Sequence, residues 1–333
     1  MDTAPQPVVP RGGLRGHWAD IRMHAASPGP VPRGRGRLAL VRYGLAQPFL
    51  GLRTIFRSND LLGISLAPTF AVLMVAGLVG WFEGSQHGVW RGLLASLVAV
   101  AALAPVPALL FGRVFAHLAA KSRAHLGLAP QQPYLRSVVQ LIGEWLAQVV
   151  LLALGVLPLT VLLRLVPLLG VVLVFCVQAA WALHWVVVEG YDNARTVPPG
   201  GNIEAIEKQA RSLPGQPWFE RLPRSISAPR WLVVLAGPLR MLLEVTVSLA
   251  RPWRVEVDLV EDEPWVSLGF GLGAASMLAV PGLNLLFRPA VVVAGVHLRH
   301  RLLPEDSSVS PELPSASSPR SGSTQPLPTV PVA

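Results

Sequence analysis

The residues of this chain best suited to holding a solute lie in an interrupted apolar stretch, Leu268 to Leu298. A Pro281-Gly282 step, Asn284 and Arg288 break a segment that is otherwise apolar. Half-helices that end at such a break leave backbone N–H and C=O groups without helical partners, and in membrane proteins these ends often lie along a solute path. Asn284 and the break could therefore present amide and backbone groups to a solute. Alternatively, Asn284 could satisfy the broken backbone itself.

Charged and titratable groups near the apolar segments offer further chemistry. Arg288 could hold a small anion, or its side chain could extend to lipid headgroups at the mouth of the stretch. His184 lies about one helical turn before Glu189, so it could relay a proton, or it could simply be packed. Asp192 and Arg195 are three residues apart and would form a local ion pair at the end of their helix.

Other classes of site find little support in the sequence. Five carboxylates between Glu256 and Glu263 could attract a hard cation, but they also fit a solvated loop. The basic N-terminal region has no aromatic platform of the kind that binds nucleic acid. The single cysteine, Cys176, excludes a cysteine cluster, and no zinc-protease, serine-hydrolase or nucleotide-binding motif is present. We therefore expect no enzyme, no metal site, no cofactor and no nucleic-acid partner.

The amino-acid composition indicates whether these segments lie in water or in a membrane. The 333 residues are 52% hydrophobic and only 14% charged, and the mean hydropathy is +0.49. Soluble proteins average about 25% charged residues, so this chain is predicted to be an all-α integral membrane protein with the lipid bilayer as its partner. Nine arginines and two aspartates precede Asp60, and a basic flank of this kind usually sets orientation and contacts anionic headgroups.

Apolar runs and breaks predict the elements of the fold. We expect a disordered basic tail over residues 1–37, a membrane domain over 38–301 and a disordered Pro/Ser-rich tail over 304–333. The domain should begin with an interfacial amphipathic helix over Arg37–Asn59, and Asn59 or Asp60 should cap the first span. About four transmembrane helices are expected, together with a second interfacial helix at 231–250; the spans are 61–79, 92–111, 145–163 and 165–188.

The closing stretch has an awkward length for a membrane segment. One straight span needs roughly 20 apolar residues, so residues 268–298 exceed one span without reaching two. The break divides them into two arms, Leu268–Val280 and Leu283–Leu298. Basic segments place both termini in the cytoplasm, so after four spans the stretch must enter and leave by the same face. We therefore expect a re-entrant helical hairpin in a multi-pass protein of the inner (plasma) membrane. Gly269 and Gly273 would allow one arm to pack closely against another helix.

Three groups of residues resemble the CysZ / etoposide-induced family of membrane proteins. The closing stretch carries a Gly-Phe start, a Pro-x-x-Asn-Leu break and a Pro-Ala-Val-Val ending. A second match follows the fourth span, and a third precedes and enters the first. The matching residues are Gly269-Phe270-Gly271, Pro281, Asn284-Leu285, Pro289 to Val292, Gly295, Tyr191 to Arg195, Gly51 and Pro68.

The resemblance implies long spans together with hairpins that penetrate partway, a homo-oligomer, and in bacterial members a permease for sulfate. Such permeases carry a Gly-Leu-Arg-like basic motif before the first span. Here Asp60, Leu61 and Leu62 occupy that place, and an acidic residue would repel sulfate. Two hypotheses follow. The chain is a permease or channel for sulfate or another small anion, with Arg288, Asn284, Pro281 and Gly282 at its path, or it is a non-transporting protein that organises the membrane or binds partners.

Overall fold

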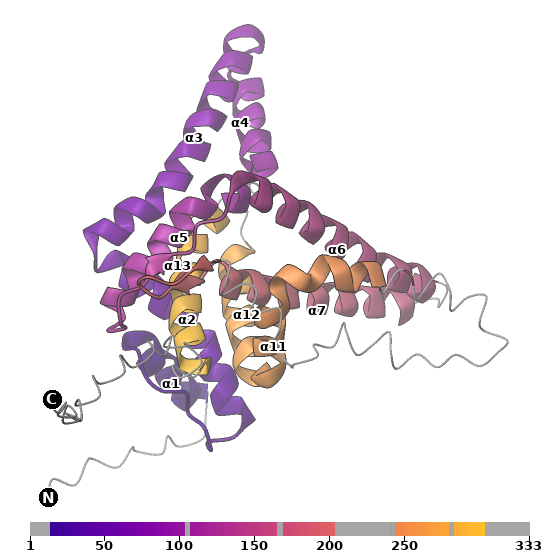
Figure 1. Cartoon of the computed structure of the whole chain (residues 1–333). Helices are drawn as coiled ribbons and strands as arrows, with labels where there is room; N and C mark the ends of the chain where they lie inside the picture. Colours follow the sequence, from indigo (N-terminus) through magenta and orange to yellow (C-terminus); the bar gives the residue numbers. More distant parts are fainter. Residues whose placement is uncertain are drawn as a thin grey trace, which may run out of the picture. The chain divides into compact units, whose positions relative to one another are not determined.

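A computed structural model describes residues 14–103, 107–164, 169–203, 241, 244–279 and 283–303, and these are almost entirely helical (Figure 1). In chain order the elements are α1 (Leu14–Ala26), α2 (Arg37–Phe56), α3 (Asn59–His87), α4 (Val89–Leu103), α5 (Pro107–His125), β1 (Gln132–Pro133), α6 (Val138–Arg164), α7 (Leu169–Asp192), β2 (Thr196–Val197), the 3₁₀ turn η2 (Arg251–Trp253), α11 (Arg254–Asp262), α12 (Pro264–Leu278) and α13 (Leu283–Leu302).

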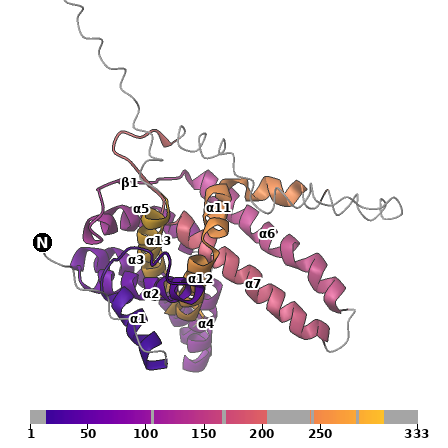
Figure 2. The same ribbon diagram turned by 90° about the horizontal axis from the view of Figure 1, so that it is seen from below.

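Helix α2 lies at the centre of the described fold, between α1, α12 and α13 (Figures 1 and 2). The sequence predicted an amphipathic helix over this segment, and the helix is present with much of its length buried by the closing helices. Gln47 shows how the contact is made. Its amide Nε2 donates to the carbonyl of Tyr43, and its Oε1 lies 2.7 Å from Nδ1 of His297 on α13, so the imidazole is the donor. Gln47 and His297 are both fully buried.

Glycines set the distance between α2 and its neighbours. A Cβ added to Gly269 on α12 would lie 2.0 Å from the carbonyl oxygen of Val41, and one added to Gly44 on α2 would lie 2.1 Å from that of Val266. Gly51 is equally close to α13, because its Cβ would lie 2.1 Å from the oxygen of Ala290. Backbone therefore packs directly on backbone, as small residues permit between membrane helices. The expected packing role of Gly269 and Gly273 corresponds to contacts with α2, where a Cβ at Gly273 would lie 2.8 Å from the oxygen of Leu45.

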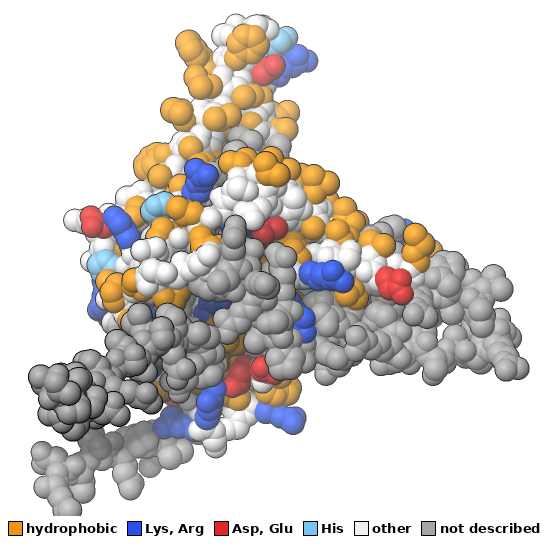
Figure 3. Space-filling model, viewed as in Figure 1, with side chains coloured by type: hydrophobic (Ala, Val, Ile, Leu, Met, Phe, Trp, Pro, Cys, Tyr) orange, Lys and Arg blue, Asp and Glu red, His pale blue; other side chains and the backbone are white. Residues whose placement is uncertain are grey.

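Two helical hairpins project from this centre. Helices α3 and α4 pack along each other through Gly80, Gly84 and Gly92, and α6 packs along α7 (Figures 1 and 2). Apolar side chains cover much of the visible surface of α3 and α4 (Figure 3). By length and composition α3 and α7 are able to cross a membrane. The described residues thus contain two candidate spans. Shorter apolar helices occur at 89–100, 138–151 and 264–278.

Several boundaries differ from the sequence-based expectation. The range predicted as the second span, 92–111, holds α4 up to Leu103 and α5 from Pro107, and residues 104–106 lie outside the described residues. Ser58 rather than Asn59 or Asp60 caps α3, and its Oγ accepts from the backbone N–H of Leu61 at 3.4 Å. The long apolar run divides as expected, since α6 ends at Arg164.

The N-terminal region contains more helix than the sequence predicts. The predicted disordered tail over 1–37 instead contains α1, whose position is fixed by Asp20 and Arg42, 3.0 Å apart. Helices α12 and α13 form the two arms of the closing stretch, but Pro281 and Gly282 lie outside the described residues. So do the predicted tail at 304–333 and most of the predicted interfacial helix at 231–250.

The glycine contacts predict a sharp difference between glycines. Gly269→Ala and Gly51→Ala should lower the thermal unfolding temperature in detergent, because the new Cβ would overlap a backbone oxygen that cannot rotate away. The matched control is Gly63→Ala on α3, where a Cβ meets nothing within 4 Å. It should leave stability unchanged or raise it by up to about 1 kcal/mol, the usual helical gain of alanine over glycine. Equal stability of all three variants would refute the packing described.

Candidate functional site

Six charged side chains from distant parts of the chain form one continuous set of ion pairs beside the core. Three are arginines and three are carboxylates, so the set is formally neutral. We name it the ion chain; in order of contact its members are Glu144, Arg136, Asp192, Arg195, Glu256 and Arg299. It joins the start of α6, the end of α7, α11 and α13.

Arg136 holds the first half of the ion chain. Its two terminal nitrogens bind the two carboxylate oxygens of Asp192, at 2.8 and 2.5 Å, and Nη1 also lies 2.6 Å from Glu144. The predicted pair of Asp192 and Arg195 is present at 3.1 Å, but Arg136 makes the bidentate contact. Burial is the largest influence and by itself lowers the pKa of Arg136, but the charge and hydrogen bonds of Asp192 together with the charge of Glu144 outweigh it, so the pKa rises and the side chain stays charged.

Glu256 is the fully buried centre of the second half. Arg195 donates to both of its oxygens, at 2.8 and 2.5 Å, and Arg299 lies 2.5 Å from Oε1. The interpretation of this acidic segment as a solvated loop is therefore wrong for Glu256, which lies on α11. Burial alone would raise the pKa of Glu256, but the two guanidinium groups lower it to about 2.

The aromatic ring of Tyr134 connects the two halves. The guanidinium carbons of Arg136 and Arg195 lie 5.0 and 5.5 Å from its centroid, which is cation–π distance. The short antiparallel ladder explains why they meet. Pro133 pairs with Thr196, so Tyr134, just after β1, is brought beside Arg195, just before β2. Sequence reasoning missed Tyr134, Arg136 and Glu144. Glu144 could have revealed this site, because a single carboxylate within an apolar segment usually has a charged or hydrogen-bonding partner inside the protein.

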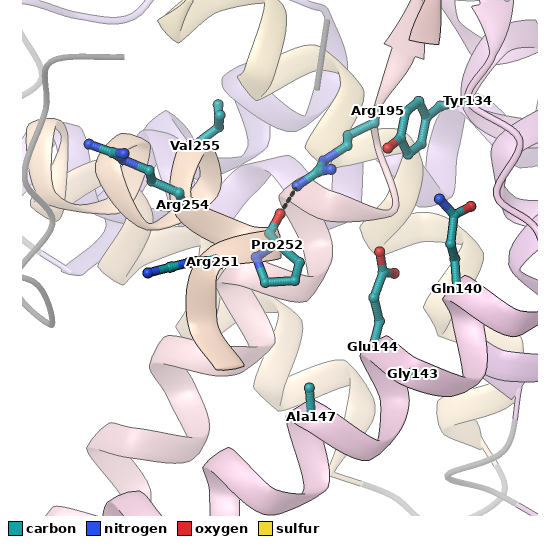
Figure 4. Close-up of a pocket in the computed structure, with 10 residues that line it drawn as sticks. All are labelled: Tyr134, Gln140, Gly143, Glu144, Ala147, Arg195, Arg251, Pro252, Arg254 and Val255. Atoms are coloured by element: carbon teal, nitrogen blue, oxygen red, sulfur yellow. Dashed lines mark hydrogen bonds between the residues drawn. The ribbon is translucent and has the colours of Figure 1, made fainter. Parts of the chain in front are cut away.

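A cavity of about 300 Å³ borders the ion chain between the start of α6 and the η2–α11 segment (Figure 4). Figure 4 shows Glu144 and Gln140 on one side and the Arg195 guanidinium at the carbonyl of Pro252, which accepts from it at 2.7 Å. The residues that line the cavity are Tyr134, Gln140, Gly143, Glu144, Ala147, Arg195, Arg251, Pro252, Arg254 and Val255. Three of these are arginines and one is a carboxylate, and Arg195 is already paired with Asp192 and Glu256.

The residues predicted from the closing stretch lie elsewhere. Arg288 on α13 pairs with Glu189 on α7 at 2.5 Å, so a carboxylate already compensates its charge. The side-chain oxygen of Asn284 is buried and has no hydrogen-bond partner among the described residues. The break itself lies outside the described residues, so both interpretations of Asn284 stay predictions.

The proposed relay from His184 to Glu189 does not form a contact. The imidazole of His184 stacks with Trp181 and meets Trp185 edge-on, at centroid distances of 6.1 and 5.8 Å. Glu189 is engaged with Arg288 instead. This geometry favours the packing interpretation of His184.

Helix α3 carries two further buried polar groups. The hydroxyls of Ser65 and Thr69 have no hydrogen-bond partner among the described residues, and Pro68 lies between them. Proline has no N–H, so the carbonyl of Ile64 also lacks its helical donor. Buried polar atoms without partners are uncommon in proteins and often have a functional explanation.

Searches for similar proteins add no further constraint. Comparison of the chain with family models, with curated proteins and with solved structures gives no match. Across the described ranges, His, Cys, Asp and Glu side chains do not gather in groups of three or more that would hold a metal ion.

The ion chain predicts a large effect at Glu256. Glu256→Ala should destabilise the protein by about 3–5 kcal/mol, because it leaves Arg195 and Arg299 buried without their carboxylate. The control is Glu83→Ala, which removes a half-exposed pair with His87 and should cost less than about 1 kcal/mol. Chemical unfolding in detergent, followed by circular dichroism, measures both. Similar losses for the two variants would show that Glu256 is not buried as described.

Proposed function

We propose that this chain is an integral membrane protein that conducts a small anion, with the cavity beside the ion chain as the anion site. Sulfate is the anion that the resemblance to the CysZ-type family implies. In this proposal the site differs from the one predicted from sequence, because Arg288 is already paired with Glu189.

Large apolar side chains that are exposed on the two hairpins support membrane insertion. Phe70, Met74 and Leu97 on the first hairpin and Phe175 on α7 are each more than 60% exposed. Transferring such a side chain out of water is worth about 1.5–3 kcal/mol, so a row of them is stable only against an apolar medium. Trp81 and Trp90, near the turn between α3 and α4, suit the headgroup level.

Four spans, two cytoplasmic termini and a re-entrant α12–α13 hairpin complete the topology that we propose. The arrangement of charge is consistent with it, because the paired charges lie at the base of the α6–α7 hairpin and not along its apolar arms. A homo-oligomer is part of the proposal on resemblance alone.

The single observation that carries anion binding is the exposed guanidinium of Arg251 at the edge of the cavity. The ion chain is neutral in itself, and Arg251, which is exposed and forms no ion pair with the described residues, adds positive charge to the lining. A guanidinium fork suits the geometry of an oxyanion, and the low dielectric beside a membrane strengthens the attraction. Sulfate would therefore lie near Arg251, at the end of the cavity away from Glu144.

One observation favours the alternative, a non-transporting protein that organises the bilayer or binds partners. Arg288 is paired with Glu189, so its charge is compensated. The other arginines in the described part of the closing hairpin lie in the last turn of α13. A passage through the hairpin would then lack an anion-binding residue, and the ion chain would serve only to hold the helices together.

Flux measurement separates the two functions. Purified protein in proteoliposomes should take up radiolabelled sulfate above the level of empty liposomes. Arg251→Gln should lower the initial rate by about ten-fold, the loss expected for one charge-assisted hydrogen bond. The matched control is Arg91→Gln, near the start of α4, which is exposed and should leave the rate unchanged. Arg288→Ala tests the site predicted from sequence.

The outcomes are distinct. Uptake that is lost in Arg251→Gln and kept in Arg91→Gln supports transport through the cavity. Uptake that depends on Arg288 and not on Arg251 would show that the anion site lies at the closing hairpin. No uptake by correctly inserted protein, in a preparation where a known permease is active, refutes the proposal in favour of the alternative.

A further inference from the structure

Helix α1 is amphipathic in the reverse sense to an ordinary surface helix. Its inward face is polar: Asp20 and His17 both contact Arg42 of α2, at 3.0 and 3.4 Å, and the ring of His24 meets Tyr43 edge-on. Its outward face carries the large apolar side chains. A helix against water would bury these side chains and expose the polar ones.

The outward face combines an aromatic, a cation and a flexible apolar side chain. Trp18 is 60% exposed and Met23 is 52% exposed, and Arg22 lies between them along the same face. Together with Ala19 they line a shallow depression in the surface. Tryptophan beside arginine is the pairing that lies at the boundary between lipid headgroups and acyl chains.

The surroundings of this face are positively charged. Arg35 and Arg37 follow α1 and are exposed, and Leu38 beside them is 59% exposed. Arg35 is near enough to act on His24: burial lowers the pKa of that imidazole, Asp20 opposes the shift and Arg35 adds to it. The nearby carboxylate of Asp20 is compensated by Arg42, so it does not cancel the outward cations.

We propose that the outward face of α1, formed by Trp18, Ala19, Arg22 and Met23, docks on an anionic membrane surface. Apolar side chains enter the headgroup region while arginines contact lipid phosphates and anionic headgroups. Charge complementarity selects this partner: the uncompensated charges at this face are cationic, and anionic lipid attracts each Lys or Arg near the surface. The proposal is independent of anion transport, because none of these residues borders the cavity.

Site-specific fluorescence in nanodiscs tests the proposal, since both faces of the bilayer are then accessible. The full chain carries Cys176→Ser and Ala19→Cys, labelled with an environment-sensitive nitrobenzoxadiazole probe. Discs contain phosphatidylcholine alone or phosphatidylcholine with phosphatidylglycerol. In the anionic discs the probe should be quenched by nitroxide-bearing lipids and protected from aqueous iodide, and added salt should weaken both effects.

Charge variants make the test specific. Arg22→Glu should lower the association of the probe with anionic discs by on the order of ten-fold, because a cation near the surface is replaced by an anion. Arg91→Glu makes the same change of net charge at an exposed site outside α1 and should have no effect. A folded protein is verified by circular dichroism for each variant.

Three results would overturn the proposal. The probe could remain accessible to iodide in both kinds of disc, which would show a water-facing helix. It could be protected from iodide without quenching by lipid, which would show that protein, such as a second copy of the chain, covers the face. Equal effects of Arg22→Glu and Arg91→Glu would show that net charge, and not α1, controls the contact.

Discussion

The direct contact of α2 with α12 and α13 is the constraint on which the rest of the structure depends. At Gly44, Gly51 and Gly269 the two backbones approach too closely for any side chain. This contact joins the first described third of the chain to its end, and it places His297 on Gln47 inside the core. Because this contact holds α13 beside α2, it also positions Arg299, two residues beyond His297, for its ion pair with Glu256.

The ion chain is the second constraint, and it acts at the base of the α6–α7 hairpin. Burying charges costs several kcal/mol for each ion, so such a network stabilises little beyond an apolar replacement. Its effect is on geometry. Arg136 and Asp192 match each other in a two-point contact, and Glu256 receives two arginines from different directions. The pairs therefore favour one arrangement of α6, α7, α11 and α13, and the cavity lies beside them.

Sequence reasoning succeeded where a pattern is local. Apolar length and flanking charge located α3, α7 and the end of α6, and the break in the closing stretch separated α12 from α13. Reasoning failed where the outcome depends on contacts between distant residues. The sequence predicted a helix over Arg37–Asn59, and α2 is present there, but its burial under α12 and α13 depends on glycine contacts with distant residues. Likewise, Glu256 belongs to an acidic run, and only the fold brings Arg195 and Arg299 to it. Spacing along the chain carries no signal of such pairings.

The apolar side chains of the two hairpins face outward, and we propose that lipid surrounds them. Cys176 offers a direct measurement, because it is the single cysteine of the chain and is exposed on the outward face of α7. A nitroxide attached there in reconstituted protein should collide often with oxygen, which concentrates in lipid, and rarely with a water-soluble nickel chelate. Frequent collisions with the chelate, or few with either reagent, would contradict a lipid-facing hairpin.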